Sequence, residues 1–334
     1  AFNNVVGNSQ SRLAGSIRAV GQIYVLNQNG INIEPGANIN ARTFVASTLP
    51  INSNLVRDGL VNLAAGNAEF LFSTTGQNGF VPPAPPVGGI YGDIVVSAGA
   101  LIETTVSAEG SGGRILLAGA NTYNSGQLSS PSGQVILAAG LQVGLSPHSK
   151  AFPQIPNRVT DDRTGNEDPS LRGLDAYVGN VGSYAGSVVN TGLISVPRGS
   201  LMMVGKSVAQ NGGVDSLTTV ALNGRVDLLA NYGAVPSPNF NGQSLSIPFL
   251  NTQSGTVSLG SGSVTRIVPD TTSGATAVSP FNRLPLKSQI NIQGRDIYFG
   301  QDAIVLAPGA DLAIAAGNWR ALSPNGTRVA PDFA

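Results

Sequence analysis

The sequence predicts an all-β fold: a right-handed parallel β-helix, wound as a solenoid with roughly 20 residues per coil. Short apolar runs rich in Val, Ile and Leu recur at a nearly constant spacing, with glycines between them. Helical periodicity is almost absent. Only 11% of the 334 residues are charged, against roughly 25% in an ordinary soluble domain. Small residues dominate, which fits a narrow interior and frequent turns.

Internal repeats carry most of this prediction. GGRILLAGA at 112–120 returns as SGQVILAAG at 132–140, and similar runs begin at Gly92, Gly199, Gly224, Gly255, Gly294 and Gly309. One coil cannot bury its own apolar face, so stacked coils would share one core. A dozen or so coils at a spacing of about 4.8 Å would give a rod of roughly 60 Å.

A longer repeat spans more than one strand. NSGQLSSPSGQVIL from Asn124 matches NTGLISVPRGSLMM from Asn190. We expect these two asparagines to stack their amides in a ladder along the solenoid. The repeat also places glycines at matching corners, where φ is positive or backbones crowd. These glycines are Gly126, Gly133, Gly192 and Gly199.

The coils are expected over 1–145 and 183–334, with a charged excursion at 146–182 between them. A further break is expected at the proline-rich run 81–87, because proline cannot donate to a strand ladder. Another is expected at 269–280, which reads as a polar surface loop. The segment 57–72 is expected to be a strand, since glycines interrupt its helical spacing. The first residues carry no signal peptide, and we expect the sequence to be a segment of a longer protein.

The stretch 15–49 contains the clearest strand-and-turn unit. Two apolar runs, at 23–26 and 44–46, flank a turn with Asn29-Gly30 at its tip. Asn-Gly is a strong turn dipeptide because both residues tolerate positive φ. From its residues alone, we expect the turn to be a structural corner of the solenoid.

This stretch resembles the N-terminal secretion domain of two-partner-secreted exoproteins of the filamentous-haemagglutinin type. The family shows an Asn-Pro-Asn-Gly-Ile turn after a strand, followed by a segment ending in Val-Ala-Ser-Thr-Leu. The matching residues are Asn27, Gln28, Asn29, Gly30 and Ile31, then Val45, Ala46, Ser47 and Thr48. Gln28 stands where the family has proline, so the turn lacks that residue's fixed φ. Close similarity covers residues 2–50, and looser repeat similarity runs to 145.

The resemblance implies a secreted or surface-exposed exoprotein of a Gram-negative bacterium. Such proteins cross a cognate outer-membrane transporter barrel unfolded, after their secretion domain engages the barrel's periplasmic domains. Mature members are adhesins, haemolysins or contact-dependent toxins, so a host-cell, carbohydrate or matrix ligand is a further expected partner. Cysteine is absent. That absence fits a chain that must stay unlinked during export, although compositional drift explains it equally well.

Two other functions stay open. Parallel β-helices also include polysaccharide lyases and hydrolases, which use paired carboxylates. Asp296 in GRDIYFG and Asp311 in GADLAIA are expected at equivalent places on neighbouring coils, with Asp93 and Asp227 less equivalent. Outward strand positions explain all four without catalysis, so we expect no enzyme activity, catalytic residue or cofactor. The other alternative is a filament protein that self-associates through open strand edges.

Composition excludes several partners and sites. The net charge is zero, which gives no basic patch for a nucleic acid. No apolar run reaches about 18 residues, as a membrane-spanning helix needs. The acidic groups at 161–162 and 166–168 lack the alternation of a calcium loop and are expected to be solvated, so no metal site is expected. His148, the single histidine, is expected to lie exposed in a loop.

Overall fold

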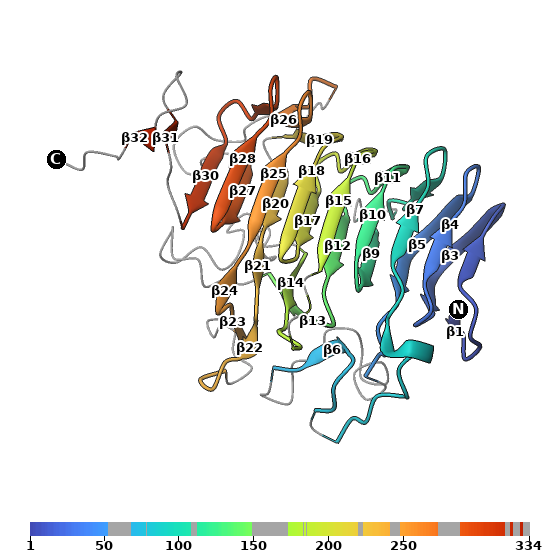
Figure 1. The fold of residues 1–334 in the computed structure, drawn as a ribbon. Coiled ribbons are helices and arrows are strands. Elements are labelled where there is room, and N and C mark those ends of the chain that lie inside the picture. The colour runs from blue at the N-terminus through green and yellow to red at the C-terminus, as the bar shows by residue number, and fades with distance from the viewer. Residues whose placement is uncertain are drawn as a thin grey trace.

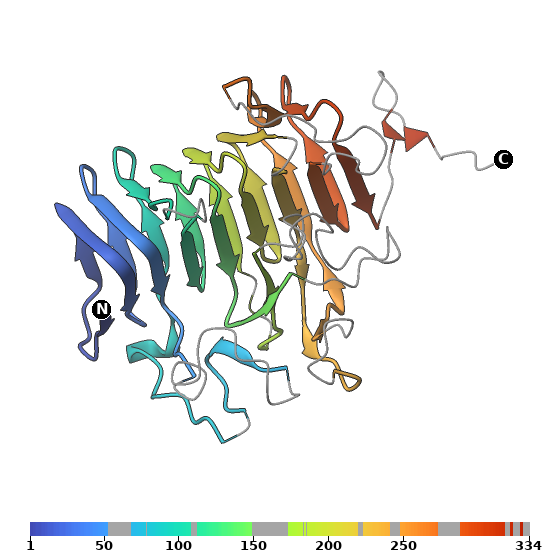
Figure 2. The same ribbon diagram turned by 180° about the vertical axis from the view of Figure 1, so that it is seen from behind.

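The chain forms a parallel β-helix, with almost no helix among the residues that the structure describes. In this computed structural model those residues are 1–52, 68–77, 79–107, 112–148, 173–182, 184, 186–219, 223–240, 248–272, 288–317, 321–322 and 328–329. Across these ranges the one helical element is a short 3₁₀ turn at Val87–Gly89, and no helix could span a membrane. Figures 1 and 2 show the coils stacked from the N-terminus to the C-terminus.

Each coil contributes a strand to each of three parallel faces. Face 1 is the eight-stranded sheet, with β2 (Ser11–Leu13), β4 (Ile31–Ile33), β7 (Ile94–Val96), β10 (Thr122–Asn124), β15 (Ser187–Asn190), β18 (Ser207–Gln210), β25 (Thr256–Leu259) and β28 (Asp296–Phe299). Face 2 has β8 (Leu101–Glu103), β11 (Gln127–Ser129), β16 (Leu193–Ser195), β19 (Gly213–Thr218), β26 (Val264–Pro269) and β29 (Ile304–Leu306). Face 3 has β9 (Arg114–Gly119), β12 (Gln134–Ala139), β17 (Ser200–Val204), β20 (Arg225–Leu229), β27 (Gln289–Gly294) and β30 (Asp311–Ala316).

Two long strands join faces 2 and 3 near the N-terminus. They are β3 (Ser16–Leu26) and β5 (Asn38–Ser47). The first part of β5 pairs with β8 and its second part pairs with β9, so β5 belongs to both faces. The short β1 (Phe2–Asn4) pairs with the second part of β3.

The described residues contain eight coils, one for each strand of face 1. Eight coils at a strand spacing of about 4.8 Å give a rod of roughly 40 Å. The expectation of a dozen coils is therefore wrong for this part of the chain. Long excursions between coils take up the remaining residues, and the repeat count included glycine-led runs from two different faces.

The repeats themselves are in register. Arg114 lies beside Gln134 on face 3, and Asn124 lies beside Asn190 on face 1. The runs at Gly92, Gly255 and Gly294 instead lead into β7, β25 and β28 of face 1. A glycine followed by an apolar strand occurs on more than one face, so local similarity alone does not assign a run to a face.

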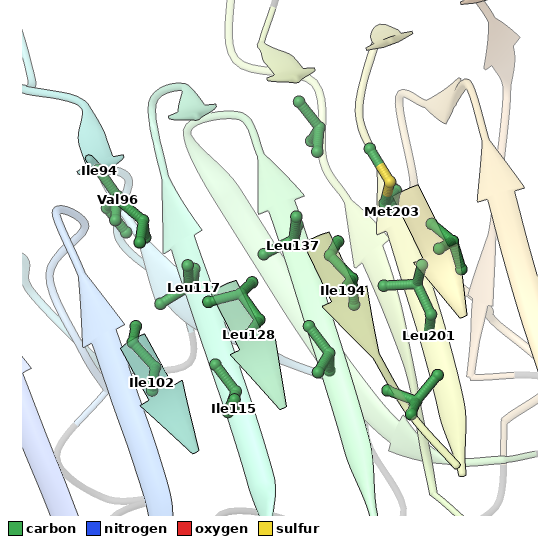
Figure 3. Packing of buried hydrophobic residues seen from close by; sticks show 14 of the residues in the cluster. Ile94, Val96, Ile102, Ile115, Leu117, Leu128, Leu137, Ile194, Leu201 and Met203 are labelled. Carbon is green, nitrogen blue, oxygen red and sulfur yellow. The ribbon is translucent and has the colours of Figure 1, made fainter. Parts of the chain in front are cut away.

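Inward side chains from the three faces form one continuous core. Ile94, Ile102 and Ile115 come from the three strands of one coil, and all are fully buried. The next coil adds Leu128 and Leu137, which also have no exposed surface. Figure 3 shows these side chains filling the narrow interior between the faces. Burial of this kind stabilises a fold by about 25 cal/mol per Å² of apolar surface.

Three excursions with strands among the described residues interrupt the coils. The first carries β6 (Phe70–Ser73), the second β13 (Gln142–Pro147) and β14 (Leu174–Val178), and the third β21 (Asn231–Tyr232), β22 (Val235–Pro236), β23 (Phe249–Leu250) and β24 (Gln253–Ser254). The second lies between β12 and β15 and includes the described part of the predicted excursion 146–182. A further pair, β31 (Ala321–Leu322) and β32 (Arg328–Val329), follows the last coil.

The sequence alone also predicts the structure of three other segments, namely 57–72, 81–87 and 269–280. Of the strand expected over 57–72, residues 70–72 lie in β6, residues 68–69 are not in a strand, and residues 57–67 lie outside the described residues. The proline-rich run leaves the ladder, as expected, and is followed by the 3₁₀ turn. The polar loop after Pro269 is described only to 272.

Neighbouring coils approach closely at the glycine corners. A Cβ at Gly192 would lie 2.0 Å from the carbonyl oxygen of Gly126, and one at Gly199 would lie 2.4 Å from that of Gly133. These glycines do not have positive φ, so crowding explains them rather than a left-handed turn. The obstacle is backbone, which cannot move aside as a flexible side chain can.

We expect Gly192→Ala to lower the free energy of unfolding by about 1–3 kcal/mol, which is the usual cost of overpacking. Gly21→Ala is the control, because a Cβ at Gly21 meets nothing within 4 Å. Chemical denaturation of both variants checks the difference. Equal stabilities would show that the coils do not pack as closely as described.

Candidate functional site

The turn 27–31 joins β3 on face 3 to β4 on face 1. Asn27 is 1% exposed. Its Nδ2 donates to the Ser9 carbonyl oxygen at 2.9 Å and to Ser11 Oγ at 2.8 Å, and its Oδ1 accepts from the Asn29 amide at 2.9 Å. A side-chain bond to an amide two residues on is the pattern of an Asx turn. Asn27 therefore holds the turn, although Gln28 lacks the fixed φ of the family's proline.

The next coil covers this turn closely. The Gly92 amide donates to the Gln28 carbonyl oxygen at 2.8 Å. A Cβ at Gly92 would lie 2.4 Å from the Asn29 carbonyl carbon. Gly30 has a φ of 119°, which disfavours other residues, and Ile31 is fully buried in the core. The turn is thus a packed corner.

The second part of the motif, 45–48, meets the first part at the same corner. The Asn27 amide donates to the Ser47 carbonyl oxygen at 3.0 Å. Ser47 Oγ accepts from the Leu49 amide at 3.0 Å, and Thr48 Oγ1 accepts from the Ala120 amide at 3.2 Å. Ser47 and Thr48 have no exposed surface. The structure therefore brings together two motif segments that are separated in sequence.

Most of the motif is inaccessible in the folded chain. Gln28 and Asn29 are half-buried, and the other residues are buried, namely Asn27, Gly30, Ile31, Val45, Ala46, Ser47 and Thr48. Val45 packs outward against the apolar cluster on face 3, whereas Ala46 packs inward in the core. In the folded chain, only Gln28 and Asn29 of these residues keep part of their surface exposed.

The repeat residues at the β10 corner form a buried amide ladder. Asn124 Nδ2 donates to Asn190 Oδ1 at 2.7 Å, and Asn190 Nδ2 donates to Gln210 Oε1 at 2.7 Å. All three side chains are fully buried. Gln210 extends the ladder by one coil, and its Nε2 donates to the Gly212 carbonyl oxygen at 3.0 Å. Buried amides are stable only when paired, so this ladder serves the structure.

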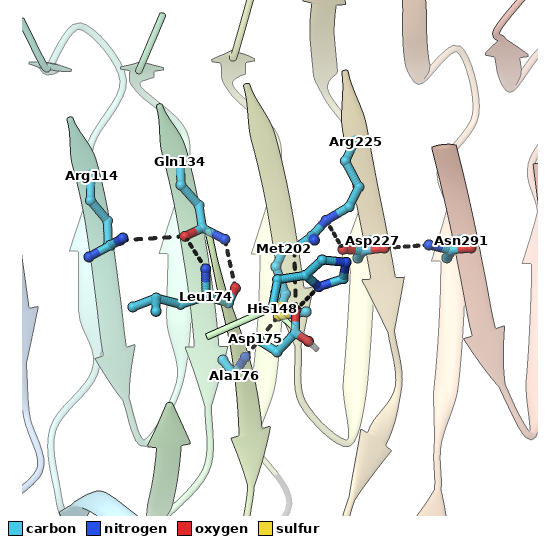
Figure 4. Close-up of polar contacts among 10 residues, drawn as sticks. All are labelled: Arg114, Gln134, His148, Leu174, Asp175, Ala176, Met202, Arg225, Asp227 and Asn291. Atoms are coloured by element: carbon cyan, nitrogen blue, oxygen red, sulfur yellow. Dashed lines mark hydrogen bonds and ion pairs between the residues drawn. The ribbon is translucent and has the colours of Figure 1, made fainter. Parts of the chain in front are cut away.

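A second polar cluster lies between face 3 and the second excursion. Asp175 Oδ1 lies 2.7 Å from His148 Nδ1 and 3.2 Å from Arg225 Nη2. Arg225 Nε lies 2.8 Å from Asp227 Oδ2, and Asn291 Nδ2 donates to Asp227 Oδ1 at 2.6 Å. Figure 4 shows these contacts reaching across the strands of face 3. The cluster attaches the excursion to the coils.

The expectation that His148 is exposed is wrong, because its side chain is 14% exposed and paired with Asp175. The acidic groups at 161–162 and 166–168 lie outside the described residues. Among the described residues, no group of three His, Cys, Asp or Glu side chains could hold a metal ion. Sequence reasoning missed this cluster because its members meet only after the excursion folds back.

The carboxylate pair that motivated the enzyme alternative is not formed. Asp296 begins β28 on face 1 beside Thr256, and Asp311 begins β30 on face 3 beside Gln289. Asp296 is paired instead with Arg295, at 2.8 Å. The similar motifs around the two carboxylates belong to different faces, so the prediction of equivalent positions is wrong.

We expect Arg225→Met to destabilise the fold by about 3–5 kcal/mol, because it removes the cation that lies between two buried carboxylates, Asp175 and Asp227. Arg266→Met is the control: Arg266 also pairs with an aspartate, Asp215, but the two side chains are 48% and 34% exposed. Exposed pairs contribute little. Denaturation of both variants measures the difference, and similar losses would contradict the burial of the network.

Comparison with known proteins gives a family for the N-terminal half. The family model of the TPS secretion domain, where TPS stands for two-partner secretion, matches residues 1–165. The crystal structure of the HMW1 secretion domain from Haemophilus influenzae aligns with 95% of this chain and 78% of that chain, at 20% identity and a TM-score of 0.49. A search of curated proteins found no match. The match over residues 1–165 confirms the resemblance of 15–49 to the TPS secretion domain family.

Proposed function

We propose that the chain is a segment of a Gram-negative exoprotein that is exported through a cognate outer-membrane transporter. The secretion-domain match over residues 1–165 carries this proposal. The motif 27–31 and 45–48 would engage the periplasmic domains of the transporter while the chain is unfolded. Its burial in the folded coils supports that order, since Asn27, Ser47 and Thr48 are almost without exposed surface.

The coils would then form outside the cell, beginning at the N-terminus. Each coil pairs with its neighbours in the stack, so it can add to those already folded without waiting for the whole chain. The exported β-helix would serve at the surface as a structural or adhesive rod. A host-cell, carbohydrate or matrix ligand and self-association stay predictions from the sequence.

Export from cells that express the transporter tests the proposal. Deleting 15–49 is expected to abolish export, because it removes both motif segments. The matched control deletes 288–322, which is equally long and removes strands of the last two coils instead. Both deletions weaken folding, so a difference between them reports on recognition.

The measurement is the amount of chain in the medium and on the cell surface, with and without the transporter. Normal export of the chain that lacks 15–49 would contradict the proposal. Equal loss of export in both deletions would also contradict it, because folding rather than the motif would then limit export.

A further inference from the structure

The three excursions combine into one layer over face 3. We define the excursion layer as β6, β13, β14 and β21–β24. Strands β14, β13 and β6 form an antiparallel sheet in that order. Phe72 and Val143 from this sheet pack with Leu116, Ile136 and Met202, which point outward from face 3. At β9, β12 and β17, face 3 is therefore buried on both sides, by the core within and by the layer outside.

The layer is fixed to face 3 by direct polar contacts. Gln134 on β12 donates to the Leu174 carbonyl oxygen at 2.7 Å and accepts from the Leu174 amide at 2.9 Å. This two-bond contact holds the start of β14. Figure 4 shows it beside the network of Asp175 and Arg225.

The first excursion depends on later parts of the chain. β6 pairs with β13, whose residues come about 70 positions later, with Phe72 beside Val143. Gln142 Nε2 also donates to Ser73 Oγ at 3.1 Å and to Thr75 Oγ1 at 2.6 Å. β6 also meets the chain that precedes it, with Ile51 beside Phe72. Its pairing with another strand, β13, forms only when the second excursion arrives.

Phe249 from the third excursion joins the other two. Its ring centroid lies 4.9 Å from that of Phe70 and 5.0 Å from that of Tyr177. Phe249 is 2% exposed, and a Cβ at Gly144 would lie 2.5 Å from its Cζ. Burial raises the pKa of Tyr177 to about 12. The three excursions therefore share one aromatic centre, which Phe249 completes.

A backbone hydrogen bond also joins the third excursion to the second. The Ala234 amide donates to the Val178 carbonyl oxygen at 2.9 Å, which joins the third excursion to β14. Contacts between residues far apart in sequence form slowly, because loop closure must occur first. Neighbouring coils without an excursion between them, such as β9 and β12, are only 20 residues apart in register.

We propose that the excursion layer is a strap that closes after the coils beneath it, and that Phe249 is the residue that closes it. The consequence for export rests on the proposed function. If the chain leaves the transporter from its N-terminus, the excursion layer can close only after Phe249 has left the transporter. The coils that contain β9 and β12, which have no excursion between them, would then pair first and gain their outer cover later. The folding order itself can be measured without a transporter.

Pulsed hydrogen exchange during refolding of the full purified chain tests this order. We expect amides of β9 and β12 to become protected before those of β6 and β14. Simultaneous protection, or earlier protection of β6, would overturn the proposal.

Native-state exchange of Phe249→Ala tests the closing residue. We expect exchange in β6 and β14 to become at least about tenfold faster, with β9 and β12 unchanged, because the layer opens separately from the coils. Phe299→Ala on β28, where the side chain is 50% exposed, is the control and is expected to leave β6 unchanged. Unchanged exchange in β6, or equal acceleration in β9 and β12, would overturn the role of Phe249.

Discussion

Close, in-register stacking of the coil backbones is the constraint on which the rest of this structure depends. At corners such as Gly192 and Gly199, the next coil leaves no room for a Cβ. The same register aligns Asn124, Asn190 and Gln210 and allows their amides to pair inside the solenoid. The amides are tolerated there because each side chain bonds to its neighbour in the ladder, although Asn124 Oδ1 at the end of the ladder accepts no hydrogen bond. The turn 27–31 is one such corner, held by the Asn27 side chain.

The excursions follow from the chemistry of face 3. Its strands RILLAG and QVILAA are apolar at consecutive positions, so both their inward and outward side chains need cover. The core covers one side, and the excursion layer covers the other. Face 1 strands such as INI alternate instead, with Asn32 half-buried on the outside. The layer thus supplies the second hydrophobic contact that the N-terminal coils need.

Much of the fold could be predicted from the sequence, because glycine spacing and short apolar runs report directly on coils. The matching positions of Asn124 and Asn190 in the longer repeat also predicted the register in which their two strands pair. Two kinds of error have physical causes. A glycine before an apolar strand occurs on more than one face, which misassigned Asp296 and Asp311. The partners of His148 come from a folded-back excursion and from a distant coil, so no local pattern indicates them. Consecutive apolar residues on face 3 were the signal that an outer layer exists.

Disulfide trapping tests the coil register most directly, since the chain has no cysteine of its own. Ser125 and Thr191 lie on neighbouring coils with their hydroxyl oxygens 2.8 Å apart. The double variant Ser125→Cys with Thr191→Cys should form an intramolecular disulfide under mild oxidation, whereas Asp296→Cys with Asp311→Cys should not. A disulfide in the second pair, or none in the first, would contradict the stacking of coils on which this account rests.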